Sequence, residues 1–182
     1  MKRSAYLYTF IPLVLLSCSS SKTYFSAAIR QSVEASHQRL EKIQFYADRD
    51  IVLRREMDTE DAKVHSGKVK IEDGHYVNII TLKKNTPGIC TVVRNNAIGV
   101  SFEQGDNKVL SFGKTKYAKP EDPYRILANE WVNDYGVVMY EGKQYHIEPE
   151  GTEASLMIKT KVYKKSVQEE RDMKGRKVAS KN

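Results

Sequence analysis

The sequence predicts a mainly β protein, in which one N-terminal amphipathic helix precedes an antiparallel β barrel or sandwich. Short runs rich in β-branched and aromatic residues recur about every 8 to 12 residues after residue 45, and turn-forming residues separate them. Only one longer stretch, near the N-terminus, has the apolar spacing of a helix and lacks both Gly and Pro. These two observations set the fold class.

The helix is expected over residues 26–44, SAAIRQSVEASHQRLEKIQ. A narrow stripe repeats at every third or fourth position and is apolar except at its middle: Ile29, Val33, Ser36, Leu40 and Ile43. Charged and amide side chains cover the other faces of the helix. The stripe either packs on the β domain or pairs with a partner helix, and packing is the expected arrangement.

The expected strands begin with IVLRREM at residues 51–57. A hairpin turn is expected at Asp73-Gly74, because a type I′ turn needs positive φ at both central residues and this pair tolerates it. Later strands are expected in the runs ICTVVR, IGVSFE, KVLSFGK, RILANEW, GVVMYE and QYHIEP. Residues 154–165, ASLMIKTKVYKK, alternate in polarity and are expected to form the last strand.

One stretch of this β region is similar to a known class of small domains. TLKKNTPGIC and the following GVSFEQGDNKVLSFG resemble SH3-like small barrels, in which a strand, a tight turn and a second strand lead into a hairpin with aromatic residues. The resemblance implies that part of the β domain is SH3-like.

The first 17 residues have the layout of a secretory signal peptide. Lys2 and Arg3 give a positively charged start, and the apolar run AYLYTFIPLVLL follows at residues 5–16. A helix that spans a membrane needs roughly 20 apolar residues, so this run is too short to cross comfortably. Residues 1–17 are therefore expected to be removed from the mature chain.

The end of this signal, Leu15-Leu16-Ser17-Cys18, resembles the lipobox of bacterial lipoprotein precursors. The resemblance implies that Cys18 becomes the first residue of the mature protein, with a diacylglycerol on its thiol and a fatty acid such as palmitate on its amine. Several acyl chains on one residue make release from a membrane negligible. The alternative is a core or free cysteine that happens to follow an apolar run.

The residues after Cys18 bear on location. Residues 18–25 are polar at first, and we expect them to form a tether between the lipid and the domain. By analogy with other lipoproteins, Ser19 in the place of an aspartate argues against retention at the inner membrane, and the lack of an acidic cluster downstream argues against export to the cell surface. The expected location is the outer membrane, with the domain facing the periplasm.

Charge and cysteine usage limit the function classes. The formal charge is +7, but residues 164–182 hold seven Lys or Arg against three acidic residues, and the body before them is close to neutral. No nucleic-acid surface is therefore expected. Residues 26–165 are expected to form one domain, and residues 166–182 a basic, disordered tail. With Cys18 acylated, Cys90 is the other of the two cysteines, so no internal disulfide is expected.

No pattern typical of a metal, cofactor or catalytic site occurs in the sequence. The four histidines, His37, His65, His75 and His146, lack the close spacing of metal ligands. A nucleophile elbow and a phosphate-binding glycine loop are also missing, so no catalytic residue, metal or cofactor is expected. The enzyme alternative is a cell-wall hydrolase that uses Cys90 and His146, although no neighbour in the sequence would activate the thiol of Cys90.

Tyrosine is the residue type that most suggests a binding surface. Three of the eleven tyrosines, Tyr135, Tyr140 and Tyr145, lie close together around an expected Glu-Gly turn. Tyrosine suits contact surfaces because it combines an apolar ring with a polar hydroxyl. These three residues are the candidate site for binding a partner protein or a glycan.

The segment KIQFYADRDIVLRRE, the SH3-like stretch and the lipobox together resemble small accessory lipoproteins of bacterial envelope secretion machines, such as type VI systems. The resemblance implies protein partners in the envelope and attachment to the membrane through Cys18. The expected function is a non-catalytic binding or scaffold component of a membrane-associated assembly.

Overall fold

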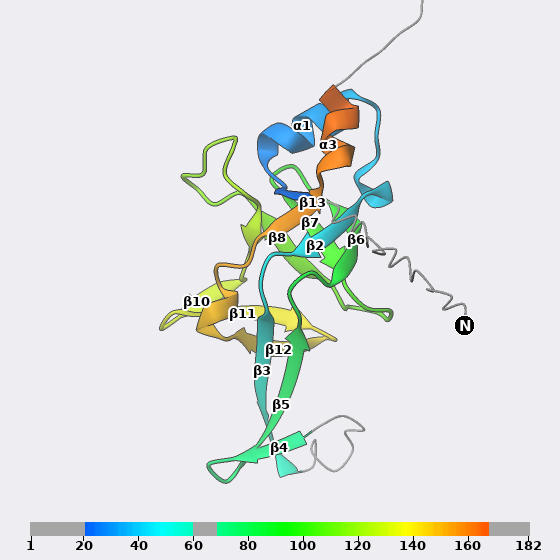
Figure 1. The fold of residues 1–182 in the computed structure, drawn as a ribbon. Helices are drawn as coiled ribbons and strands as arrows, with labels where there is room; N and C mark the ends of the chain where they lie inside the picture. Colours follow the sequence, from blue (N-terminus) through cyan, green and yellow to red (C-terminus); the bar gives the residue numbers. More distant parts are fainter. Residues whose placement is uncertain (1–20, 60–68, 168–182) are drawn as a thin grey trace, which may run out of the picture.

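The protein is mainly β, as predicted, and its strands form two antiparallel sheets in the computed structural model (Figure 1). The structure describes residues 21–59 and 69–167. The expected signal peptide, Cys18, His65 and residues 168–182 of the expected tail lie outside the described residues.

The first sheet has seven strands in the order β1-β13-β2-β6-β7-β8-β9. Its strands are β1 (Lys22–Tyr24), β13 (Leu156–Lys159), β2 (Gln44–Ala47), β6 (Pro87–Val93), β7 (Ala97–Ser101), β8 (Leu110–Gly113) and β9 (Arg125–Ile126). The consecutive strands β6, β7 and β8 form an antiparallel meander within the stretch that resembles SH3-like barrels.

The second sheet has six strands in the order β10-β11-β12-β3-β5-β4. Its strands are β10 (Glu130–Val132), β11 (Tyr135–Tyr140), β12 (Lys143–Ile147), β3 (Ile51–Met57), β5 (His75–Leu82) and β4 (Val69–Glu72). Strand β3 has the predicted bounds. The predicted hairpin joins β4 to β5, and Asp73 and Gly74 adopt φ of 49° and 82° there, as a type I′ turn requires.

Both sheets contribute side chains to one hydrophobic core. The aromatic centre comes from Phe25, Phe45 and Tyr124, whose rings meet edge to face at centroid distances of 5.1 and 5.2 Å. Leu53 and Ile147 enter the same cluster from the six-stranded sheet. Among the described residues the sheets are not closed into a barrel, so of the two predicted arrangements the fold is closer to a sandwich.

Helix α1 (Ala27–Ala35) is shorter than the helix predicted over residues 26–44. It begins where predicted, because the Ser26 hydroxyl accepts a hydrogen bond from the backbone N–H of Ile29 at 3.3 Å. It ends early because His37 adopts a φ of 56°, which a right-handed helix cannot continue through.

The second half of the predicted helix takes other structure. Leu40–Lys42 form a single 3₁₀ turn, and β2 already begins at Gln44. The predicted apolar stripe nevertheless faces inward, since Val33 and Ile43 are buried in the core. The stripe therefore packs on the domain, as expected, rather than pairing with a partner helix.

The two ends of the domain also differ from prediction. Residues 22–24, expected in the tether, form β1, which pairs with β13 from Lys22↔Lys159 to Tyr24↔Met157. The expected last strand stops at Lys159, and helix α3 (Thr160–Val167) replaces its second half and the first residues of the expected tail. Figure 1 shows α3 lying beside α1 at one end of the molecule.

Candidate functional site

The structure separates the three tyrosines that were expected to form one binding cluster. Tyr135 is 40% exposed, whereas Tyr140 and Tyr145 are only 5% and 0% exposed. Tyr135 and Tyr140 are the first and last residues of β11, and their odd separation puts them on opposite faces of the sheet. The rings of Tyr140 and Tyr145 meet inside, edge to face, at 6.4 Å. This corrects the prediction: of the three tyrosines, only Tyr135 is exposed at the surface.

An open hollow of about 670 Å³ lies on the outer face of the six-stranded sheet, next to Tyr135. It is lined by Arg54, Arg55, Glu56, Tyr135, Gln144, His146 and Glu148. His146 of β12 pairs with Arg54 of β3 and with Val137 of β11, so side chains from three adjacent strands share this face. The lining carries both charges and an aromatic ring, a mixture suited to contact with another protein or with a sugar.

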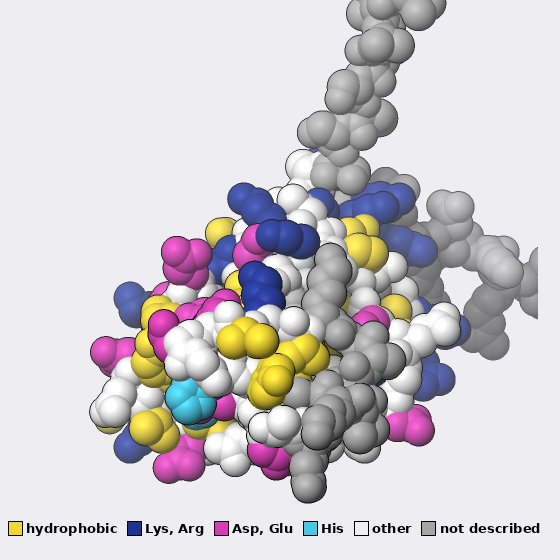
Figure 2. Space-filling model, turned by 90° about the horizontal axis from the view of Figure 1, so that it is seen from below, with side chains coloured by type: hydrophobic (Ala, Val, Ile, Leu, Met, Phe, Trp, Pro, Cys, Tyr) yellow, Lys and Arg dark blue, Asp and Glu magenta, His cyan; other side chains and the backbone are white. Residues whose placement is uncertain are grey.

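An apolar patch borders this hollow. We define it as Val132, Tyr135 and Met139, which are between 40% and 49% exposed. The register Val132↔Tyr135 places the first two opposite each other, and Met139 lies on the same face of β11. Figure 2, which looks at the molecule from the side of the six-stranded sheet, shows hydrophobic side chains beside acidic ones and a histidine.

Trp131 extends the apolar surface around the edge of the sheet. It belongs to the edge strand β10, is about half exposed and lies against Gly136 of the neighbouring strand. Aromatic side chains at sheet edges and in patches of this kind are enriched among residues that dominate protein–protein contacts.

Sequence reasoning identified only part of this outer face. It named Tyr135 and His146 but missed Met139, although the period of two along GVVMYE was a usable signal for which residues share a face. It also missed Arg54, because nothing in the sequence indicates that β3 lies next to β12. Eight strands separate the two along the chain.

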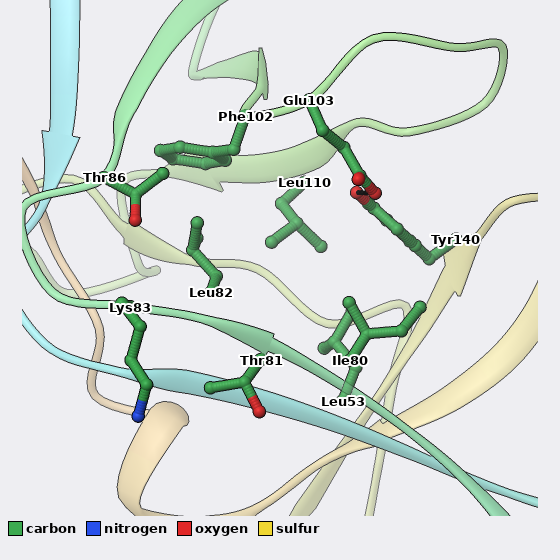
Figure 3. Close-up of a pocket in the computed structure, with 10 residues that line it drawn as sticks. All are labelled: Leu53, Ile80, Thr81, Leu82, Lys83, Thr86, Phe102, Glu103, Leu110 and Tyr140. Carbon is green, nitrogen blue, oxygen red and sulfur yellow. Dashed lines mark hydrogen bonds between the residues drawn. The ribbon is translucent and has the colours of Figure 1, made fainter. Parts of the chain in front are cut away.

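A smaller pocket of about 190 Å³ lies between the two sheets (Figure 3). Its lining is mostly apolar and consists of Leu53, Ile80, Thr81, Leu82, Lys83, Thr86, Phe102, Glu103, Leu110 and Tyr140. Figure 3 shows Leu82 and Leu110 at its centre and Glu103 meeting Tyr140 at one end. The volume is below the roughly 300 to 1,000 Å³ usual for ligand pockets, so the space suits one small apolar group.

The polar end of this pocket is a connected network. The Tyr140 hydroxyl donates to Glu103 Oε1 at 2.6 Å, and Lys108 Nζ lies 3.2 Å from Glu103 and 2.9 Å from Glu141. The hydrogen bond from Tyr140, with Lys108 beside it, holds the pKa of Glu103 below its usual range. Burial, together with that carboxylate, raises the pKa of Tyr140. The network therefore keeps Glu103 ionised and Tyr140 protonated at neutral pH.

Cys90 lies in the core, on β6 of the seven-stranded sheet, and is 3% exposed. Its thiol is 3.5 Å from the backbone oxygen of Val92. Burial raises the pKa of this thiol, which is the opposite of what activation as a nucleophile requires.

His146 lies on the other sheet and is exposed in the hollow, where its ring meets the Tyr135 ring at 6.4 Å. The residues that line the hollow do not include Cys90. The structure thus does not bring together the two residues of the hydrolase alternative.

The remaining histidines give no further site. His37 occupies the turn after α1, and His75 begins β5 as an exposed residue. Within residues 21–59 and 69–167, no three His, Cys, Asp or Glu side chains are grouped so that they could hold a metal ion. In the same residues, no helix is both long enough and apolar enough to cross a membrane.

Comparison with known proteins assigns this domain to no family. No family model matches the chain, and neither a curated protein nor a solved structure shows significant similarity to it.

Proposed function

We propose that this chain is a lipid-anchored lipoprotein of the outer membrane, that its domain faces the periplasm, and that it acts as a non-catalytic binding or scaffold component of a membrane-associated assembly. A type VI secretion machine is one assembly to which such a component would belong. The observation that carries the proposal is the sequence Leu15-Leu16-Ser17-Cys18 at the end of a short apolar run with a basic start.

A binding role is supported by the outer face of the six-stranded sheet. The apolar patch exposes Tyr135 and Met139 beside a hollow that carries Arg54, Glu56 and His146. Contact surfaces between proteins combine such an apolar centre with a polar rim. The burial of Cys90 and the raised pKa of its thiol favour the binding role over a thiol-dependent hydrolase.

The anchoring is tested by replacing Cys18. Cys18→Ala removes the thiol that would carry the diacylglycerol, so we expect loss of fatty-acid labelling and an uncleaved precursor that still contains residues 1–17. Metabolic labelling with a fatty-acid probe, followed by mass spectrometry of the N-terminus, measures both. Cys90→Ala is the matched control because it removes the other cysteine, and it should leave labelling intact. Equal labelling in the Cys18 variant would disprove the anchor.

The binding surface is tested by replacing Tyr135. Truncating a central aromatic side chain costs a contact at least about 1 kcal/mol, or roughly fivefold in affinity. We therefore expect Tyr135→Ala to reduce the yield of envelope proteins that co-purify with the lipoprotein after chemical cross-linking. Tyr117→Ala is the matched control, because Tyr117 is a fully presented tyrosine, 87% exposed, in a loop of the other sheet. Unchanged yield for both variants would place the partner elsewhere.

A further inference from the structure

The outer face of β1, β13 and β2 combines tyrosine rings with lysine ammonium groups. Tyr24, Met157 and Tyr46 pair directly across these three strands. Lys22 and Lys159 are also in register, and they lie on the same face two residues away from Tyr24 and Met157 along their strands. The Lys22 ammonium lies 4.5 Å from the centre of the Tyr46 ring, and Tyr24 is 50% exposed.

Within the part of the chain that the structure describes, the strands that form this face carry no acidic side chain. No Asp or Glu occurs in β1, β13, β2 or the next strand, β6. Helix α3 continues directly from β13 and adds three exposed lysines, Lys161, Lys164 and Lys165, again without an acid. Strands β1, β13 and β2 and helix α3 thus carry five lysines and no acidic residue, although the body of the protein is close to neutral.

The covalent chain places this edge near residue 18. The backbone oxygen of Ser21 accepts a hydrogen bond from the N–H of Thr160 at 2.9 Å, so the folded domain already begins at Ser21. Only Ser19 and Ser20 separate Ser21 from Cys18. Three residue steps span at most about 11 Å when fully extended, which is no more than about twice the thickness of one headgroup layer, roughly 5 to 7 Å.

We propose that the outer face of β1, β13 and β2 is a lipid-facing surface that rests on anionic phospholipid headgroups, and this rests on the proposed acylation of Cys18. Tyrosine is enriched at the membrane–water interface because its ring and hydroxyl suit the two sides of that boundary. Lys22 and Lys159 lie where the phosphates would be, and a lysine near an anionic surface is attracted to it within a Debye length.

The proposal fixes an orientation for the whole domain. Because the two sheets share one core, their outer faces point in different directions. Docking through the seven-stranded sheet turns the apolar patch and its hollow away from the bilayer, toward the periplasmic space. The anchor would then do more than retain the protein, since it would also present Tyr135 to partners.

The orientation is testable with one pair of labelled sites. Tyr24→Cys and Tyr135→Cys, each in a Cys90→Ala background, place a fluorophore on the outer face of one sheet or the other. The full acylated chain is reconstituted in phosphatidylcholine vesicles with or without phosphatidylglycerol, and nitroxide-labelled headgroups serve as quencher. We expect several-fold stronger quenching at site 24 than at site 135, a difference that grows with phosphatidylglycerol and shrinks with salt.

Charge reversal sharpens the test. Lys159→Glu should lower the docked population at least fivefold in phosphatidylglycerol vesicles, since one lysine contact near an anionic surface corresponds to about that factor. Lys70→Glu makes the same charge change on β4 of the other sheet and should have no effect.

The outcomes are distinct. Protein that carries no fatty acid would overturn the anchoring and, with it, this inference. Acylated protein that is quenched equally at sites 24 and 135, or that responds equally to both charge reversals, would overturn the lipid-facing surface alone.

Discussion

The two sheets share one core, but they differ in what they place on either side of it. The seven-stranded sheet, with the residues directly after β1 and directly before β9, supplies the aromatic centre, in which Phe25, Phe45 and Tyr124 are buried. The six-stranded sheet closes the core with Leu53 and Ile147 and then extends beyond it, because β3 and β5 continue to the β4 hairpin at the far end of the molecule (Figure 1). The aromatic centre therefore lies against the first sheet, while the second sheet also buries Tyr140 and Tyr145.

The outer faces of the two sheets also differ in the side chains that they display. In the seven-stranded sheet, the outer face of β1 and β13 displays lysines and a tyrosine without acidic residues, next to the start of the domain. The other displays Arg54, Glu56 and His146 with an apolar patch. Residues that stabilise the fold and residues available for recognition thus lie in separate places, so substitutions can change one property without the other.

The largest expected effect is on stability and falls on the seven-stranded sheet. Phe45→Ala removes a fully buried ring that contacts Phe25 edge to face, and such truncations cost about 3 to 5 kcal/mol of unfolding free energy. Met139→Ala on the outer face of the other sheet should change it by less than about 0.5 kcal/mol, because Met139 is half exposed. Urea unfolding followed by circular dichroism measures both. Similar losses in the two variants would contradict the division between the sheets.

Local turn chemistry and strand periodicity made much of the fold predictable. Asp73-Gly74 required positive φ and formed the expected turn, and IVLRREM formed β3 over the expected residues. Both signals are local, since a turn type or a β-rich run depends on neighbouring residues alone. The arrangement of the strands into two sheets depends on contacts between distant segments and was not predictable in this way.

Two predictions failed where one pattern fits two structures. Leu40 and Ile43 continue the helical spacing, but the left-handed His37 had already ended the helix and the same residues are buried by a turn and a strand. Val162 fits an alternating strand, yet the lysines at 161, 164 and 165 also fit one face of a helix, and α3 forms. In both cases packing against the core decided between the alternatives.

The site prediction failed for a simpler reason. Tyr135 and Tyr140 were grouped by nearness in the sequence, whereas their separation along one strand puts them on opposite faces. The parity of the positions would have shown that only one of them could belong to a surface cluster.

The second-largest expected effect on stability falls at the junction of the two sheets. Tyr140→Phe removes the hydroxyl that donates to Glu103 at 2.6 Å and should cost about 1 to 2 kcal/mol at neutral pH. Tyr140 belongs to the six-stranded sheet and Glu103 follows β7 of the other sheet. The loss measures how strongly this bond couples the sheets, and urea unfolding at pH 7 detects it.

The pH dependence of the same variant provides the control. The pKa of Glu103 is lowered in the folded state, so its contribution to stability is present above the unfolded pKa of about 4.3 and is lost as the pH falls through the lower folded value. The wild type should therefore lose more stability than Tyr140→Phe on acidification from pH 7 to pH 3. The raised pKa of Tyr140 predicts a further loss in the wild type above about pH 10, where only the unfolded state ionises. If the stabilities of the wild type and of Tyr140→Phe changed in parallel with pH, the hydrogen bond would contribute nothing to stability.

The smallest effect is expected at the outer face of the six-stranded sheet. Arg54 Nη2 lies 2.6 Å from Glu72 Oε2, and the pair connects β3 to β4 across the intervening β5. Both side chains are about one-third exposed, so water screens the attraction, and a double-mutant cycle with Arg54→Met and Glu72→Gln should give a coupling of only about 0.2 to 1 kcal/mol. The coupling should decrease further at high salt. Because Arg54 also lines the hollow, Arg54→Met should reduce partner capture by a larger factor than Glu72→Gln while both remain nearly as stable as the wild type. A coupling comparable to the loss in Phe45→Ala would instead make this face part of what holds the fold together.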